Sequence, residues 1–260
     1  MTTYVIATPK GGVGKTTTAA EVTAALAHTG RTVLAVDLDQ QGNLTARLGI
    51  TPTTEIPGTT ADVLAGTTPL DQATTPSPAV PGADVLAGTH ALADIETTPP
   101  ADLVTFLRDE LPHHTHRWAD TVIDTPPSVG PLTQAGLAAA HTIIAPVTPT
   151  VEAYDQLKRL QAVLDARIRR RVNRSAKIGW VVPVMFDSRA ATGHGRLLDR
   201  DVLDQLSTTW PGRVTPTVRE TVTARDAYLD NQPVSTYAPD SPVAADYQAV
   251  TTLITQEAPA

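Results

Sequence analysis

The segment that most constrains this chain is the glycine-rich run TPKGGVGKTT at residues 8–17. It follows an apolar run at residues 4–7, typical of a buried strand, and leads into residues 16–28, which read as a helix. Glycines let backbone N–H groups face an anion, and the start of a helix adds the positive end of its dipole. Lys15 and Thr16 occupy the positions that contact the β and γ phosphates and Mg²⁺. The sequence therefore predicts a nucleotide-binding P-loop.

Two residues of this segment differ from an ordinary phosphate-binding loop. Pro9 stands where the first glycine of such a loop is expected, and a second lysine, Lys10, lies just inside the loop. Because one lysine, Lys15, is enough to bind a triphosphate, Lys10 needs a different role.

Acidic residues follow two further apolar runs. They belong to DLDQQGN at residues 37–43 and to VIDTPPS at residues 122–128. Open α/β sheets bind ligands at the carboxyl ends of their strands, so we expect these acids beside the phosphate loop. One acid can position the attacking water, and Asp124 has the usual place of the acid that holds the Mg²⁺ hydration shell. Turn or helix-capping aspartates are the alternative. The stiff exit at Pro126 and Pro127 can report whether the γ-phosphate is present.

The alternation of strands and helices predicts an α/β fold, a doubly wound and mostly parallel sheet with helices on both faces. Further strands are predicted at residues 32–39, 120–126, 141–147 and 177–185. Further helices are predicted at residues 131–140, 150–172 and 193–207, and Gly30 is predicted to cap the first helix. No boundary divides the sequence, so we expect residues 1–260 to form a single P-loop domain.

The middle of the chain, residues 51–100, is rich in Thr, Pro and Ala, which indicates a linker. The sequence ADVLAGT occurs there twice, at residues 61–67 and 83–89. Seven matching residues are too few to indicate a repeat architecture. We predict a short helix for the first copy and a strand for the second, with context deciding between them.

Composition excludes cysteine-dependent sites and argues against membrane insertion and secretion. The chain has no cysteine, which excludes disulfides, thiolate metal sites, iron–sulfur clusters and cysteine nucleophiles. No apolar run approaches the roughly 20 residues that span a bilayer, and no signal segment opens the sequence. These features predict a soluble cytoplasmic protein.

Charge is distributed unevenly along the chain. The formal net charge is −7, yet residues 156–200 hold 11 Lys or Arg against 3 Asp, a local balance of +8. The rest of the chain therefore sits at −15. A solvated helix face is one interpretation of such a block. Binding of a polyanion is the other, because screening makes local charge matter more than the total.

Three motifs together, KGGVGKTT, DLDQQGN and DTPPS, resemble the ParA family of DNA-partitioning ATPases. This family belongs to the deviant Walker A group, which also includes MinD. The likeness continues through IIAPVTPTVEA (143–153), VVPVMFDSR (181–189) and TPTVRE (215–220), whereas residues 51–100 match only loosely. Two positions depart from the family pattern, because Gln40 replaces the proline of DLDPQ and Pro9 stands where Gln or Ser is usual.

The resemblance implies ATP and Mg²⁺ as cofactors and an ATP-bound dimer in which Lys10 reaches the nucleotide of the partner subunit. The catalytic residues that it implies are Lys10, Lys15 and Asp39. The nucleotide-binding residues that it implies are Lys10, Gly11, Gly12, Val13, Gly14, Lys15, Thr16 and Thr17, with Met185, Phe186 and Pro216 around the adenine. The metal site that it implies consists of Thr16, Asp37, Asp39 and Asp124.

The resemblance implies that the basic block binds DNA, because the family binds DNA without sequence preference through basic residues on the dimer surface. The candidate DNA contacts are Arg167, Arg169, Arg170, Arg171, Arg174, Arg189, Arg196 and Arg219, with Arg200 and Arg213 nearby. Such binding rests on phosphate contacts, so it weakens steeply with salt.

The function that the resemblance implies is that of a short ParA-type ATPase without an N-terminal helix-turn-helix. ATP drives a sandwich homodimer onto double-stranded nucleoid DNA, and a ParB-like centromere-binding protein stimulates slow Mg²⁺-dependent hydrolysis and release. Residues 247–260 lack a Lys/Arg-rich amphipathic helix, so we expect no membrane attachment. Two alternatives stay open: a related ATPase that positions a protein cargo, and an ATP-dependent amidoligase.

Overall fold

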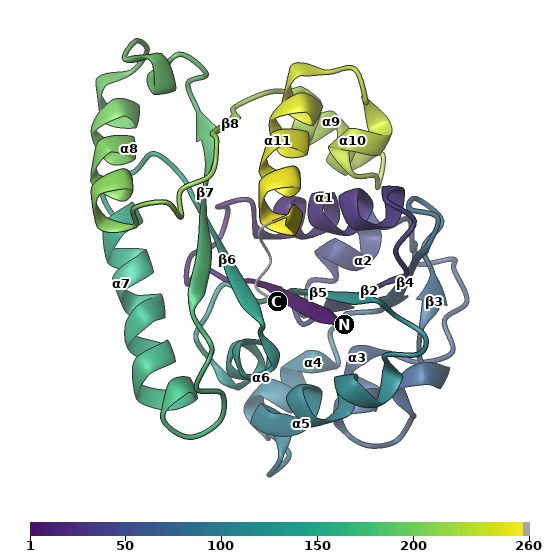
Figure 1. Cartoon of the computed structure of the whole chain (residues 1–260). Coiled ribbons are helices and arrows are strands. Elements are labelled where there is room, and N and C mark those ends of the chain that lie inside the picture. Colours follow the sequence, from purple (N-terminus) through teal and green to yellow (C-terminus); the bar gives the residue numbers. More distant parts are fainter. Residues whose placement is uncertain (257–260) are drawn as a thin grey trace.

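The computed structural model describes residues 1–256, leaving aside the side chain of Ala191. An eight-stranded sheet forms its centre, in the order β3-β4-β2-β5-β1-β6-β7-β8 (Figure 1). Its strands are β1 (Thr2–Ile6), β2 (Val33–Asp37), β3 (Thr75–Pro76), β4 (Ala83–Leu86), β5 (Asp120–Asp124), β6 (Thr142–Val147), β7 (Ile178–Phe186) and β8 (Val218–Arg219). Neighbouring strands are parallel except for the antiparallel pair β3–β4, which confirms the predicted mostly parallel sheet.

Helices cover both faces of the sheet, as predicted (Figure 1). One face carries α1 (Lys15–His28), α2 (Asn43–Arg47), α9 (Thr223–Leu229), α10 (Val234–Tyr237) and α11 (Pro242–Gln256). The other face carries α3 (Thr60–Leu64), α4 (Leu92–Thr97), α5 (Leu103–Glu110), α6 (Pro131–Ala139), α7 (Ala153–Val163) and α8 (Leu197–Thr209). Short helical turns are η1 (Leu70–Gln72), η2 (Leu111–His114), η3 (Leu164–Arg169) and η4 (Ala190–Thr192).

The central strands bury both of their faces, so they read as continuous apolar runs. Side chains alternate along a strand, and in β1 Tyr4 and Ile6 pack on the α1 side while Val5 packs on the α6 side. In β2 the same alternation separates Ala35 from Leu34. Two hydrophobic cores therefore enclose the sheet, and they fix the strand ends that position the functional site.

The helix expected at residues 150–172 starts at Ala153 as α7 and ends in the wide turn η3. The sequence pattern hides this turn because the buried side chains Leu157, Leu160, Leu164 and Ile168 keep helical spacing across it. The helix expected at residues 193–207 likewise starts later, at Leu197 in α8. Gly30, predicted to cap the first helix, follows α1 with φ of 80°.

The linker prediction for residues 51–100 is wrong, because the segment forms α3, η1, β3, β4 and α4. Its few apolar residues, including Leu64, Leu70 and Leu86, are buried in the core. The two copies of ADVLAGT are a helix (α3) and a strand (β4), which confirms that prediction.

Among residues 1–256, no helix has both the length and the apolar character required to cross a bilayer. The segment 247–260, for which we expect no membrane attachment, is described as far as residue 256 in α11, and residues 257–260 lie outside the described part.

Candidate nucleotide-binding site

The glycine-rich segment connects the end of β1 to the start of α1 at the carboxyl edge of the sheet. Gly12 and Gly14 have φ of 72° and 76°, values that an L side chain rarely adopts. A Cβ atom at Gly14 would also lie 3.3 Å from Val184. Gly14 is the residue before the first turn of α1, whose free N–H groups form an anion site at the loop.

A cavity of about 390 Å³ lies over this loop, and we name it the triphosphate cavity. It brings together Asp39 and most of the predicted P-loop residues, namely Gly11, Gly12, Gly14, Lys15, Thr16 and Thr17. Val13 is buried, so its backbone alone can contribute to the cavity. The residues that the sequence predicted around the phosphates, apart from Lys10 and Val13, thus line one cavity.

Lys15 is buried and folds back across its own loop. Its Nζ donates a hydrogen bond to the backbone carbonyl of Lys10 at 2.7 Å. Burial lowers the pKa of Lys15, while the carboxylates of Asp124 and Asp39 act in the opposite direction. A phosphate in the cavity supplies the negative charge that this buried ammonium favours.

Asp124, at the end of β5, is buried beneath Thr16, whose Oγ1 donates to Asp124 Oδ2 at 2.7 Å. The other oxygen, Oδ1, is buried and finds no hydrogen-bond partner within residues 1–256. Burial raises the pKa of Asp124 to about 8, and the charge of neighbouring Asp37 adds to this effect. A cation placed here would favour the charged carboxylate.

Asp37 ends β2 next to Asp124 in the sheet. Its Oδ2 accepts hydrogen bonds from the backbone N–H and the hydroxyl of Thr45, at 2.9 and 2.8 Å. Its Oδ1 accepts the N–H of Asp39 at 3.1 Å. Burial raises the pKa of Asp37 to about 6. The geometry places Asp37 beneath the loop that it holds, whereas Asp39 lines the cavity and accepts the N–H of Gln41 at 3.0 Å.

A magnesium ion fits this arrangement, with ligands from both the protein and the nucleotide. Within residues 1–256, no cluster of three or more His, Asp or Glu can hold a metal by itself. Mg²⁺ bound with substrate phosphates needs one or two protein groups and keeps several waters. The Thr16 hydroxyl and the unpaired Asp124 Oδ1 would supply those contacts. When bound, the ion would neutralise phosphate charge.

A second cavity, of about 480 Å³, adjoins the triphosphate cavity, and we name it the apolar cavity. Val184, Met185 and Val218 contribute apolar side chains to it. Met185, which the resemblance places near the adenine, is 41% exposed and lines both cavities. The apolar cavity is large enough for a base, which is bound through apolar walls.

The other two residues expected near the adenine lie elsewhere. Phe186 is 0% exposed and packs in the core on the opposite face of the sheet from Val184. Met185 has φ of 61°, and the β7–β8 register shifts at this point, so regular alternation breaks and Phe186 turns away. Pro216 is exposed in the loop before β8 and does not line either cavity.

Lys10 lies outside the triphosphate cavity of its own chain. Its Nζ is 3.9 Å from Glu152, and its side chain is 38% exposed. Together with Pro9, Asp155 and Gln156, these two residues line a separate hollow of about 400 Å³. The two lysines of the loop therefore point to different places, Lys15 inward and Lys10 outward.

The arginines of η3 and the following turn form a basic surface. Arg167, Arg170, Arg171 and Arg174 are exposed, and none makes an ion pair within the part of the chain that the structure describes. Arg169 pairs with Asp165 at 2.9 Å. We name the four unpaired residues the η3 arginines.

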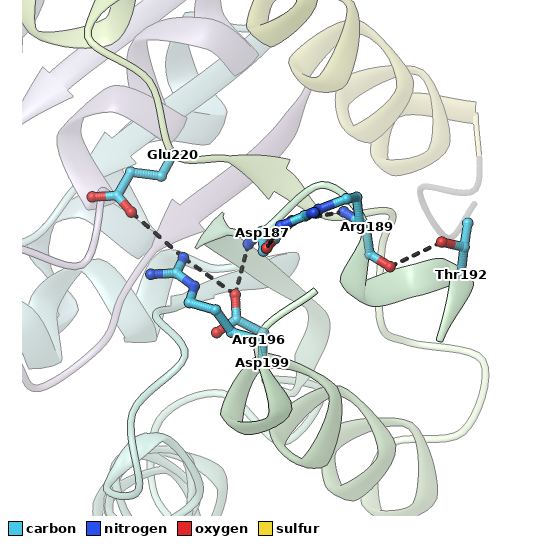
Figure 2. A network of polar contacts seen from close by, with 6 residues as sticks. All are labelled: Asp187, Arg189, Thr192, Arg196, Asp199 and Glu220. Atoms are coloured by element: carbon cyan, nitrogen blue, oxygen red, sulfur yellow. Dashed lines mark hydrogen bonds and ion pairs between the residues drawn. The ribbon is translucent and has the colours of Figure 1, made fainter. Parts of the chain in front are cut away.

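Acidic residues hold the remaining candidate DNA contacts, as Figure 2 shows for Arg189 and Arg196. Arg189 pairs with Asp187 at 2.9 Å. Arg196 lies 3.3 Å from Asp199 and 3.5 Å from Glu220. Asp187 and Asp199 lie two and three residues from these arginines, a spacing that the sequence offered as a signal, whereas Glu220 comes from a distant segment.

Arg219 is held in the same way. Its Nη2 donates to Asp246 Oδ1 at 2.8 Å, and its Nε and backbone N–H donate to the other oxygen of that carboxylate. Its charge is therefore already matched by a carboxylate, in contrast to the η3 arginines.

Sequence reasoning missed Gln41, Arg47 and Tyr228, which also line the triphosphate cavity. Gln41 and Arg47 follow the DLD motif closely, which was an available signal. Tyr228 comes from α9, far along the sequence, and nothing near it in the sequence pointed to a nucleotide.

Comparisons with known proteins show the family of this chain. An AAA domain family matches residues 1–178. The chromosome-partitioning ATPase Soj of Thermus thermophilus is 33% identical over 246 residues, covering 94% of this chain and 91% of that protein. The chromosome partitioning protein ParA of Myxococcus xanthus is 34% identical over 197 residues, covering 73% of this chain and 66% of that protein.

A solved structure of a related protein supports the fold and the cofactors of this chain. Cobyrinic acid a,c-diamide synthase from Mycobacterium smegmatis, with bound ADP and magnesium, has a TM-score of 0.80 and 28% identity. The match covers 98% of this chain and 95% of the synthase. With Lys15 and Thr16 lining one cavity and Asp124 hydrogen-bonded beneath Thr16, the chain has the residues to use ATP and Mg²⁺. It belongs to the ParA/Soj family of ATPases.

Proposed function

We propose that this ATPase segregates DNA by an ATP-controlled cycle. An ATP-bound sandwich homodimer binds double-stranded DNA of the nucleoid without sequence preference. A ParB-like protein, bound at a centromere-like site, stimulates hydrolysis and releases the subunits. The names of the curated relatives, chromosome partitioning proteins at 33% and 34% identity, support this assignment.

The observation that carries the dimer is the position of Lys10. Its amine lies outside its own triphosphate cavity, only loosely paired with Glu152, while Lys15 serves that cavity. A compact charge on a long stem can reach a second subunit. In the proposed dimer, Lys10 contacts the phosphates bound by the partner, so neither site is complete alone.

Substitution of Lys10 tests this assignment. Lys10→Ala is expected to bind ATP with wild-type affinity and to stay monomeric with ATP in light scattering. Lys15→Ala is the matched control, because it removes the same charge from the same loop and is expected to lose ATP binding itself. A Lys10→Ala protein that still dimerises with ATP contradicts the proposed role.

DNA binding rests on the η3 arginines, none of which makes an ion pair in the described chain. A dimer doubles the number of phosphate contacts, so ATP can switch DNA affinity without remodelling each subunit. Gel-shift on random-sequence DNA is expected to give tight binding with ATP and weak binding with ADP or no nucleotide. Equal binding in all three states contradicts the switch.

The proposed hydrolysis uses groups that surround the γ-phosphate end of the cavity. Lys15 would bind phosphate oxygens, Thr16 and Asp124 would hold Mg²⁺, and Asp39 would orient the attacking water. Asp39 suits this role because it lines the cavity and its backbone is fixed by Asp37.

A second candidate function is an ATP-dependent amidoligase, favoured by the 28% identity to the diamide synthase along 98% of this chain. Such an enzyme couples ATP to amide formation from a carboxylic acid and ammonia. ATP turnover that rises with ammonia and a dicarboxylic acid, and not with DNA plus a ParB-like protein, would favour it. The reverse result favours partitioning, and stimulation by a cargo protein instead of a ParB-like protein favours the cargo-positioning alternative.

A further inference from the structure

A buried guanidinium stands out beside the nucleotide-binding site. Arg47 ends α2 and is 6% exposed. Its Nε and Nη1 are buried and have no hydrogen-bond partner within residues 1–256. Its Cζ lies 4.9 Å from the ring centroid of Tyr228, which is its evident contact. Burying a cation whose N–H donors have no acceptor costs free energy. A bound anion would offset that cost.

Within residues 1–256 no carboxylate makes an ion pair or hydrogen bond with Arg47. Glu21, on α1, is the carboxylate that influences Arg47 most, but it accepts the backbone N–H groups of Val234 and Ser235. Tyr247, on α11, is buried, and its raised pKa keeps it neutral. Burial lowers the pKa of Arg47, so the surroundings as a whole do not compensate its charge.

The position of Arg47 indicates which anion it meets. The triphosphate cavity and the apolar cavity share five lining residues, Gly14, Thr17, Arg47, Met185 and Tyr228. A nucleotide that has its β and γ phosphates at Lys15 and its base in the apolar cavity has its α-phosphate and ribose at this junction. Of these two groups, the α-phosphate carries the negative charge.

We propose that Arg47 binds the α-phosphate of the adenine nucleotide, with the Tyr228 ring as the platform for its guanidinium. The hydroxyl of Tyr228 donates to Asn43 Oδ1 at 3.2 Å, which ties this platform to the start of α2. Because ATP and ADP share the α-phosphate, Arg47 contributes equally to both. It sets how long either nucleotide is retained and does not distinguish them. This inference rests on the ATP site alone and is independent of partitioning.

Calorimetric binding of ATP and ADP to an Arg47→Ala variant tests the proposal. Hydrogen bonds to charged groups of this kind lead us to expect a loss of roughly 10- to 100-fold for both nucleotides. Arg47→Lys is expected to recover part of the loss, since it keeps the charge but not the planar donor pair. Lys177→Ala removes an exposed charge remote from both cavities, and its affinities are expected to equal those of the wild type.

The two diastereomers of ATPαS identify the phosphate that is contacted, because each replaces one α-oxygen by sulfur. The wild type is expected to bind them unequally, and Arg47→Ala is expected to lose that preference. Wild-type affinity of Arg47→Ala for ATP and ADP, or weakened binding with the preference intact, overturns the proposal. A wild-type protein that binds no ATP would instead contradict the nucleotide site as a whole. Arg47→Gln replaces Arg47→Ala if the alanine variant does not fold by circular dichroism.

Discussion

At the scale of single residues, Glu21 is a carboxyl group buried on the α1 face of the sheet. Its oxygens accept the N–H groups of Val234 and Ser235 at the start of α10. Arg47 from α2 and Tyr247 from α11 lie close to it. Burial raises the pKa of Glu21, so in the folded protein it keeps its proton at pH values where the unfolded chain has lost it.

The stability of the folded state should therefore depend on pH through Glu21. Its contribution to the free energy of unfolding is fully present below the unfolded pKa of 4.5 and is lost as pH rises through the raised folded pKa. Glu21→Gln keeps the hydrogen-bond acceptor and removes the titration. Urea unfolding of both proteins from acid to neutral pH should show wild type losing stability relative to Glu21→Gln, by about 1.4 kcal/mol per unit of pKa displacement. Parallel pH curves would contradict the raised pKa.

Asp39 is expected to serve the chemical step without contributing to ground-state binding. Asp39→Asn keeps the acceptor for the N–H of Gln41 and removes the negative charge that orients water. We expect ATP affinity within about twofold of wild type and hydrolysis slowed by roughly 100-fold or more, in the range of general-base contributions. Single-turnover hydrolysis measures the step directly. A variant with wild-type turnover would show that another group positions the water.

Local sequence predicted those residues whose roles depend on their own loop or strand end. Lys15, Thr16 and Asp124 follow from motif spacing, because a parallel sheet brings its carboxyl ends together. Local sequence did not predict the positions of Arg47 and Phe186. The burial of Arg47 depends on α9 and α11, and the orientation of Phe186 depends on a positive φ at Met185. Both effects come from packing between distant segments.

At the scale of elements, the two copies of ADVLAGT have different structures because their flanks differ. The first copy follows Thr59, whose hydroxyl accepts the N–H of Asp62 at 3.2 Å while Asp62 Oδ2 accepts the N–H of Thr59 at 2.9 Å. This capping box starts α3. In the second copy the matching Asp84 instead accepts from Trp118 Nε1 at 2.9 Å and pairs with Arg117. Long-range partners therefore decide the outcome.

The second copy also supports the loop that follows β2 and carries the DLD motif, through Gly88. A Cβ atom there would lie 2.7 Å from Asp37 Cγ and 2.8 Å from the carbonyl oxygen of Asp39. Its N–H donates to Thr45 Oγ1 at 2.9 Å. The DLD loop thus packs directly against the end of β4, where only glycine fits.

Gly88→Ala should push the DLD loop out of position. We expect roughly 1–3 kcal/mol of destabilisation from overpacking and a fall in ATP hydrolysis beyond what lost stability explains. Thr89→Ala, one residue on, is the control and should be close to wild type. Thermal unfolding and turnover below the unfolding range separate the two effects. Wild-type hydrolysis by Gly88→Ala would mean that the loop tolerates displacement.

At the scale of the whole molecule, the basic block stands out from an acidic chain. The η3 arginines lie after the end of α7, on the layer of helices opposite α1 (Figure 1). Nearby acids already pair with Arg169, Arg189, Arg196 and Arg219, so among the eight candidate DNA contacts the unpaired charge lies in the η3 arginines.

The double variant Arg170→Ala/Arg171→Ala is expected to weaken DNA binding for all sequences alike. The slope of log affinity against log salt should fall by about 2 per subunit, one for each lost phosphate contact. Arg169→Ala is the matched control, because Asp165 already pairs with that arginine, and it should change the slope less. ATP affinity should stay at the wild-type level in both. An unchanged slope in the double variant would place the DNA surface elsewhere.

The outward position of Lys10 makes the proposed cycle sensitive to copy number. A site completed by a second subunit works only in pairs, and in dilute solution the amount of pairs falls with the square of protein concentration. Halving the number of molecules in a compartment would thus remove more than half of the working sites. Through this lysine, the ATPase activity of each chain would depend on the local concentration of the other chains.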